Sequence, residues 1–258
     1  MSSPAHRLTT ARTLRAEWHK LWTVRSTWIT LLTAVAFTVG LGIAIGATYE
    51  DGGGDADMDV LVLSLIGFQF AQVALAVLGI LVTAGEYSTG MIRSTMTAVP
   101  RRTPVLWSKA AVFGAVVLAV TLVTTFATFL LTQIFYGDTD QAASLGDPGI
   151  SRGLLGSAAG LTLLALIALG TGALVRSVPG AIGGFVTLVL IVPQTLLALP
   201  YDTVRDAVDY FPAEAFAALN TAAPLADGAS PGGGLLALVL WTAGILLAAA
   251  ARLKRRDV

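Results

Sequence analysis

The residues whose types and spacing are best suited to chemistry lie in the polar stretch 86–109. Glu86, Gly90 and Arg93 are spaced at i, i+4 and i+7, so they share one face if the stretch is helical. Residues before a proline disfavour the helical region, and such a helix would therefore end before Pro100. The sequence predicts a short charged helix over 86–99, suited to transmitting force from a soluble partner. A basic loop that only sets membrane topology is the alternative, and the pattern alone favours neither.

Other kinds of chemistry are excluded by residue types that the chain lacks. It has no cysteine, so disulfides, thiolate nucleophiles and cysteine metal sites are ruled out. Its two histidines, His6 and His19, cannot form a histidine-rich metal site or a catalytic triad. It also lacks the Gly-x-x-x-x-Gly-Lys-Ser/Thr loop that usually cradles ATP. We therefore expect no catalytic or metal-ligating residues, no cofactor bound by this chain and no nucleic-acid partner.

Long apolar segments must position the polar stretch. Of the 258 residues, 55% are hydrophobic and 12% are charged, whereas soluble domains carry about 25% charged residues. About 20 helical residues cross a hydrocarbon core of about 30 Å. Six charge-free stretches are long enough, and we predict spans near 27–48, 61–84, 110–134, 154–175, 179–199 and 233–251. The expected fold is an all-α polytopic membrane protein, a single transmembrane domain over 1–258, whose fifth span is kinked or broken by prolines.

The charges divide by sign between alternate connecting segments. All basic residues except Arg152 and Arg205 lie in four segments. These are the N-terminal segment, the loops that follow the second and the fourth predicted spans, and the C-terminal tail. These four segments contain the acids Glu17, Glu86 and Asp257, and all other acids lie in the remaining segments. Because basic segments stay in the cytoplasm, both termini are expected there. The predicted spans hold none of the ionisable residues that ion-coupled transporters use, so uphill transport would need energy from a partner.

Residues 8–24 have the pattern of an amphipathic helix lying on the inner membrane surface. Apolar residues recur on one face, namely Leu14, Trp18, Leu21 and Trp22. Arg12 lies across from them, and Arg15 is placed to reach lipid phosphates. We expect Arg12, Arg15, Trp18 and Trp22 to anchor this helix at the interface. The alternative is a plain basic flank that only sets topology.

The longest outer segment, 202–231, also keeps a helical spacing of apolar residues. Val204, Val208 and Phe211 alternate with polar positions such as Asp202 and Asp206. One or two short helices over 202–220, dipping into the outer leaflet, would satisfy this pattern. An ordinary capped loop is the alternative.

Few polar side chains are available at membrane depth to line a solute path. The candidates are Gln69, Gln72 and Gln194, together with Phe68, which could line an apolar cavity beside the first glutamine. Buried amides face other protein or water rather than lipid. Hydrogen bonding between helices is the alternative for the glutamines, and we favour it over contact with a solute.

These features together resemble one family, the ABC-2 type permeases, which are the membrane subunits of bacterial ATP-driven exporters. The resemblance rests on the basic N-terminal helix, the six spans, and Glu86-Tyr87-x-x-Gly90-x-x-Arg93 followed by Pro100-Arg101-Arg102. It implies that 86–99 is a coupling helix docking in a groove of a separate ATPase, and that 8–24 is a connecting helix. The partner-facing residues would be Glu86, Tyr87, Gly90, Arg93, Pro100, Arg101 and Arg102.

The resemblance also implies an assembly and a function. Two permease copies, identical or related, would join two ATPase subunits that bind ATP and Mg²⁺, in the bacterial cell membrane. The absence of charge within the spans favours an apolar or amphipathic solute, such as a drug, a peptide antibiotic or a lipid. The alternative hypothesis is a membrane anchor or sensor subunit that binds a cytoplasmic partner and transports nothing.

Overall fold

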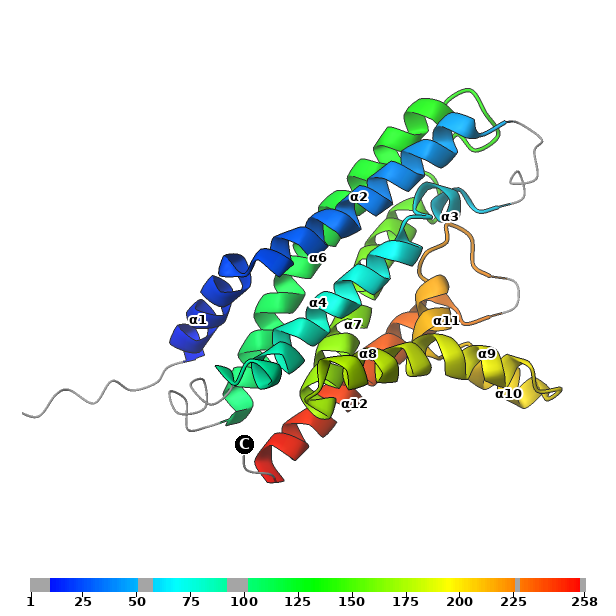
Figure 1. Ribbon diagram of the computed structural model, residues 1–258. Coiled ribbons are helices and arrows are strands. Elements are labelled where there is room, and N and C mark those ends of the chain that lie inside the picture. Colours follow the sequence, from blue (N-terminus) through cyan, green and yellow to red (C-terminus); the bar gives the residue numbers. More distant parts are fainter. Residues whose placement is uncertain (1–9, 51–57, 92–101, 226–227, 256–258) are drawn as a thin grey trace, which may run out of the picture.

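The computed structural model describes residues 10–50, 58–91, 102–225 and 228–255, and these residues form helices and connecting turns without any strand (Figure 1). Among these described residues, six helices or helix runs are long and apolar enough to cross a membrane. They are α2 (Arg25–Thr48), α4 (Phe68–Ser88), α6 (Arg102–Tyr136), α7 (Ile150–Val175), the run α8–η1–α9 (Val178–Leu197) and α12 (Pro231–Arg255). The predicted all-α class and the six membrane-length segments are confirmed, and the chain is a multi-pass membrane protein.

Helix α7 forms the centre of the bundle. Of its most apolar window, 72% is buried inside the protein, and α4, α6 and α12 all pack against it. Its contact with α4 is close because small residues face each other there. A Cβ on Gly79 would lie 2.6 Å from the carbonyl oxygen of Ala165, and a Cβ on Gly172 would lie 2.3 Å from Thr83 Oγ1. Small residues of this kind let membrane helices approach at backbone distance.

The second predicted span, 61–84, is not one continuous helix. A short helix, α3 (Val60–Ser64), is separated from α4 by the turn at Leu65–Gly67. The turn is held against α2, since a Cβ on Gly67 would lie 2.2 Å from the carbonyl oxygen of Phe37. This contact is tertiary, and therefore hydropathy along the chain does not reveal it. The span begins at Phe68 and continues through Glu86 to Ser88.

The fifth span is irregular, as its prolines predict. It contains a π-helical turn, η1 (Thr187–Ile191), directly before α9 (Val192–Leu197), in which Pro193 occupies the first turn. Proline lacks an N–H donor and its ring clashes with the carbonyl four residues earlier, here that of Val189. The wider π turn provides room at that position and keeps the segment helical.

The segments that connect the spans gather at two ends of the bundle. One end, which we call the basic end, holds α1 (Thr10–Thr23), the start of α6 and the end of α12 (Figure 1). The opposite end, the acidic end, holds α3, residues 137–149 and the two short helices α10 (Asp202–Val208) and α11 (Pro212–Ala217). Both short helices fall within 202–220, where the sequence predicted one or two.

Candidate functional site

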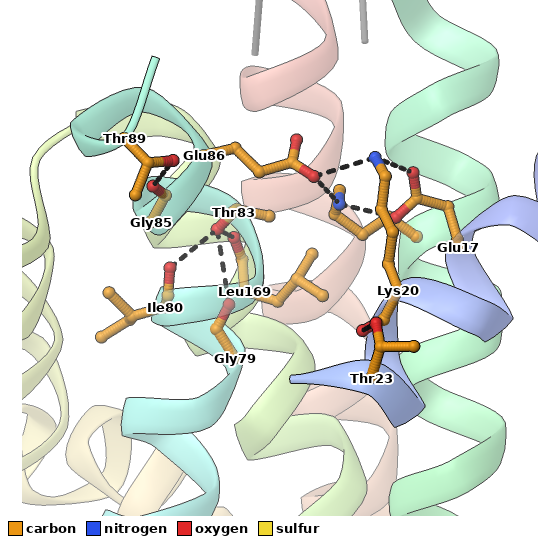
Figure 2. Close-up of polar contacts among 11 residues, drawn as sticks. Glu17, Lys20, Thr23, Gly79, Ile80, Thr83, Gly85, Glu86, Thr89 and Leu169 are labelled. Atoms are coloured by element: carbon orange, nitrogen blue, oxygen red, sulfur yellow. Dashed lines mark hydrogen bonds and ion pairs between the residues drawn. The ribbon is translucent and has the colours of Figure 1, made fainter. Parts of the chain in front are cut away.

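Four charged side chains meet at the basic end, and we call them the ion quartet: Glu17, Lys20, Glu86 and Lys109. Lys109 Nζ lies 2.6 Å from Glu17 Oε2 and 2.9 Å from Glu86 Oε1. Lys20 Nζ lies 3.0 Å from Glu17 Oε1 and 3.1 Å from Glu86 Oε1. Figure 2 shows Glu86 reaching from α4 toward the two residues of α1. Each carboxylate thus contacts both ammonium groups, and the formal charge of the quartet sums to zero.

The quartet is buried, and its pairing explains how charges are tolerated there. Glu17 and Lys109 are each 6% exposed and Glu86 is 4% exposed, while Lys20 is partly exposed. A charge removed from water is tolerated only when it is paired and hydrogen-bonded. Burial lowers the pKa of Lys20, but the negative charges and hydrogen bonds of Glu17 and Glu86 outweigh burial, so that its pKa is raised above the ordinary 10.5.

Three helices position these side chains. In α1, Thr13, Glu17 and Leu21 are buried at intervals of four residues, so Glu17 points into the bundle beside an apolar neighbour. Helix α1 packs chiefly on α6, whose second turn carries Lys109. Helix α4 is fixed one turn before Glu86, where Thr83 Oγ1 donates a hydrogen bond to the carbonyl oxygen of Leu169, 2.9 Å away in α7. The quartet therefore joins α1, α4 and α6.

The expected interfacial residues are spread along α1, with the arginines in its first half and the tryptophans in its second half, toward the junction with α2. Arg12 and Arg15 are exposed, and Trp18 is 44% exposed. The ring of Trp22 contacts that of Trp18 edge to face, at a centroid distance of 5.4 Å, and the tilted ring of Trp28 of α2 at 4.7 Å. The helix predicted over 8–24 is present as α1 at Thr10–Thr23. Its most buried face, however, is centred on Glu17 rather than on the tryptophans.

The residues predicted to face a partner are placed differently from one another. Glu86 belongs to membrane helix α4, and its side chain pairs with the lysines of the ion quartet. The guanidinium carbon of Arg176 lies over the Tyr87 ring, 5.3 Å from the ring centroid. Helix α4 ends at Ser88, and Gly90 adopts a φ of 73°. The described part of 86–99 is therefore not a single helix that starts at Glu86, because the left-handed residue at position 90 follows the end of α4, and residues 92–99 lie outside the described residues.

The remaining partner-facing residues are in or next to a part of the chain that is not described. Arg93, Pro100 and Arg101 lie outside the described residues, and Arg102 is the first residue of α6. The two described flanks of this segment are nevertheless fixed relative to each other. Glu86 precedes it, Lys109 follows it, and their side chains are 2.9 Å apart.

A pocket of about 340 Å³ lies beside the quartet, between α4 and the junction of α1 with α2. Its walls combine charged residues of the quartet with apolar side chains, among them Leu21, Val24, Leu78 and Val82. Glu86 lines this pocket, and its second oxygen, Oε2, is buried without a hydrogen-bond partner. In Figure 2 this oxygen is the one without a dashed contact.

The candidates for a solute path do not form one cavity. Gln69 and Gln194 are exposed on the outer surface of α4 and α9, and Gln72 Nε2 donates a long hydrogen bond of 3.4 Å to Gln69 Oε1. Phe68 is a core residue, 2% exposed, with its ring centroid 6.2 Å from that of Phe216. Of the four candidates, Gln72 alone lines the cavity of about 40 Å³ between α4 and α8.

Sequence reasoning missed the partners of Glu86, although a signal was present. Glu17 is an acid within a basic segment, and it lies four residues before Leu21 on the inward face of α1. An acid on that face needs a cationic partner.

Within the part of the chain that the structure describes, no group of three or more metal-ligating side chains occurs. No protein-family model matches the chain, and no curated protein matches it.

Proposed function

We propose that this chain is the permease subunit of an ABC-2 type exporter in the bacterial cell membrane, with the basic end in the cytoplasm. A second permease copy and two copies of a separate ATPase would complete the transporter. The ATPase subunits would bind ATP and Mg²⁺, since this sequence has no phosphate loop of its own. The transported solute would be apolar or amphipathic.

The observation that supports this proposal is the ion pairing of the two residues that bound the segment 86–109. Glu86 at the end of α4 and Lys109 at the start of α6 pair with each other and with Glu17 and Lys20 of α1. A displacement of the intervening segment would move two membrane helices and α1 together. Their ends cannot separate without breaking ion pairs and leaving a buried charge unpaired. Such a joint suits a segment that receives mechanical work from an ATPase.

In the proposed cycle, ATP binding closes the ATPase pair and moves the docked segment 86–109 at the basic end. The quartet passes this displacement to α4 and α6, and α4 passes it to α7 through their close contact at Gly79 and Gly172. Helices that pack this closely have a few discrete arrangements, and they move together as a unit. The helices would then alternate access between the two sides of the membrane, with a route formed between two permease copies.

The test is association with an ATPase, measured on the full chain. The tagged protein is purified from native membranes, and co-purified chains are searched for a phosphate-loop sequence by mass spectrometry. Arg93→Glu should remove that ATPase while leaving membrane insertion intact. Arg205→Glu is the matched control, since Arg205 is exposed on α10 at the acidic end.

Two outcomes would count against the proposal. An ATPase that binds equally well to both variants would show that residues 86–109 do not dock it. An ATPase that binds wild type through Arg93, but whose hydrolysis in proteoliposomes responds to no apolar or amphipathic solute, would favour the anchor or sensor subunit instead.

A further inference from the structure

Three glutamines lie toward the outside of the bundle on helices that are long and apolar enough to cross a membrane. Gln69 and Gln194 are exposed, and Gln72 is half-buried where α4 meets α8 and η1. Among the described residues, their amides share one hydrogen bond, from Gln72 Nε2 to Gln69 Oε1, and at 3.4 Å it is long. Most of their donors and acceptors are therefore left for a partner outside the chain.

The start of α4, which carries Gln69, lies at the depth of the membrane interior. Phe70, the next residue, stacks its ring on that of Phe37 at a centroid distance of 5.1 Å. Phe37 is at the midpoint of the 24-residue span α2, about 18 Å from either end of that helix. Lipid tails offer no hydrogen-bonding group at this depth, so an exposed amide there has to face protein or water.

The glutamines belong to one surface, which we call the amide face and define as the exposed sides of α4 and of the run α8–η1–α9. These two elements pack against each other (Figure 1), and a small cavity of about 40 Å³ between them is lined by Gln72 of α4 and Leu190 of η1. On the run, exposed residues follow one another at intervals of three or four, namely Gly183, Thr187, Leu190 and Gln194.

The composition of the amide face suits contact with a copy of itself. An amide carries both donors and an acceptor, so the same glutamines in a second copy can supply the missing hydrogen bonds. From Phe68 to Gly85 and from Val178 to Leu197 the sequence has no ionisable residue, so a two-fold axis sets no like charges against each other. A Cβ on Gly183 meets no atom of the chain within 4 Å, and such small exposed residues let a neighbouring helix approach closely.

We propose that two copies of this chain associate in the membrane through the amide face, with Gln69, Gln72 and Gln194 forming hydrogen bonds across a two-fold axis. This inference rests on the second copy named in the proposed function, and it adds which surface that copy covers. It requires neither the ATPase nor a transported solute.

The experiment is cysteine cross-linking in native membranes. The chain has no cysteine, so each introduced cysteine is its only thiol. Gln69→Cys, Val73→Cys and Gly183→Cys are oxidised separately with copper phenanthroline, and a disulfide forms where two Cα atoms lie within about 7 Å. At least one of the three should give a covalent dimer on electrophoresis. Val123→Cys on α6 and Leu247→Cys on α12 are the matched controls, since these side chains are 71% and 59% exposed on other helices, and both should remain monomeric.

The other outcomes separate this inference from the proposed function. Dimers from the controls but from none of the three amide-face variants would place the second copy elsewhere, which overturns the inference and leaves the proposed function standing. No dimer at any position, with a monomer mass for wild type by native mass spectrometry, would remove the second copy from both. Rapid labelling of Gln69→Cys by a charged, water-soluble thiol reagent, without cross-linking, would show that water and not a second copy faces the amide.

A double variant tests the hydrogen bonds themselves. Gln69→Leu/Gln72→Leu keeps good helix formers at both positions but removes two amides from each copy. The dimer dissociation constant in detergent micelles should rise about tenfold or more. Thr33→Val on α2 is the matched control, because it also removes a polar group from a span, but that hydroxyl donates to the carbonyl oxygen of Ile29 in its own helix at 2.7 Å. Equal dissociation constants for the double variant and wild type would refute the proposal.

Discussion

The two ends of the bundle are held together by different kinds of contact. At the basic end, three buried charged side chains and the partly exposed Lys20 join three helices through ion pairs. At the acidic end, Asp59 accepts hydrogen bonds from the backbone of Ala222 and Ala223, and Tyr49 donates one to Asp140 at 2.5 Å. These contacts tie loops to helix ends and are partly or fully exposed.

The contrast shows where mechanical rigidity resides in this molecule. A buried ion pair is costly to break because separation leaves an uncompensated charge in a dry environment. An exposed hydrogen bond is exchanged for water at little cost. The basic end is therefore the stiff joint of the bundle, and the acidic end can rearrange more easily.

The largest effect is expected from removing one charge of the quartet. Lys109→Met leaves Glu17 Oε2 without its partner at 2.6 Å, and it should destabilise the protein by about 3–5 kcal/mol. Thermal unfolding in detergent measures this change. The double variant Lys109→Met/Glu86→Gln, which restores equal charge, should regain part of the loss. Unfolding of Lys109→Met at the wild-type temperature would mean that the basic end is no stiffer than the acidic end.

A smaller effect is expected from the main tie at the acidic end. Asp59→Ala removes the cap on α3, in which Asp59 Oδ1 accepts a hydrogen bond from Leu61 N at 2.9 Å. It also removes the two hydrogen bonds that Asp59 Oδ2 accepts from the backbone of Ala222 and Ala223. The loss should be about 1–3 kcal/mol by thermal unfolding. Asp138→Ala, at an exposed aspartate of the same end, is the control and should be neutral. A loss for Asp59→Ala larger than that for Lys109→Met would reverse the comparison.

A single exposed hydrogen bond should matter less again. Tyr49→Phe keeps the ring beside Tyr136, at a centroid distance of 5.3 Å, and removes the bond to Asp140. We expect a loss of about 0.5–1 kcal/mol or less in thermal unfolding, because both groups can bond to water instead. A loss of several kcal/mol would show that the acidic end is also a rigid joint.

The smallest effect is a pH dependence at the acidic end. Burial, and then the nearby charge of Asp209, raise the pKa of Glu214 above its ordinary 4.5. The protonated form is therefore favoured by folding, so its contribution is present below about pH 4.5 and is lost as pH rises through the folded pKa. Glu214→Gln should be slightly more stable than wild type at neutral pH and equal to it in acid. Equal stability of the two proteins at neutral pH would contradict this prediction.

The sequence predicted the membrane-length segments because hydropathy is a local property. The six charge-free stretches leave little choice of where the spans lie along the chain. It did not predict the turn at Leu65–Gly67, which depends on contact with Phe37 of another helix. It assigned Glu86 to a partner surface because the residue adjoins a charged stretch. The pairing of Glu86 with Lys109, and of Lys109 with Glu17 92 positions away, depends on how three helices assemble.

The third span was predicted near 110–134, and the helix that contains it, α6, begins at Arg102. The residues 102–109 are too polar to pass a hydropathy criterion, yet they continue the helix. Their helical state is what brings Lys109 to Glu17 and Glu86. Propensity and capping would have favoured this extension, since Pro104 in a first turn is compatible with a helix start.

The uninterrupted length of α6 has a consequence for movement. Its 35 residues make a rod of about 52 Å, well beyond a hydrocarbon thickness of about 30 Å. The rod carries Lys109 near one extremity and Tyr136 at the other, where the latter packs beside Tyr49. Rocking this rod about its middle would swing its two extremities in opposite directions. A displacement received at one membrane face would thereby reappear, reversed in sense, at the other.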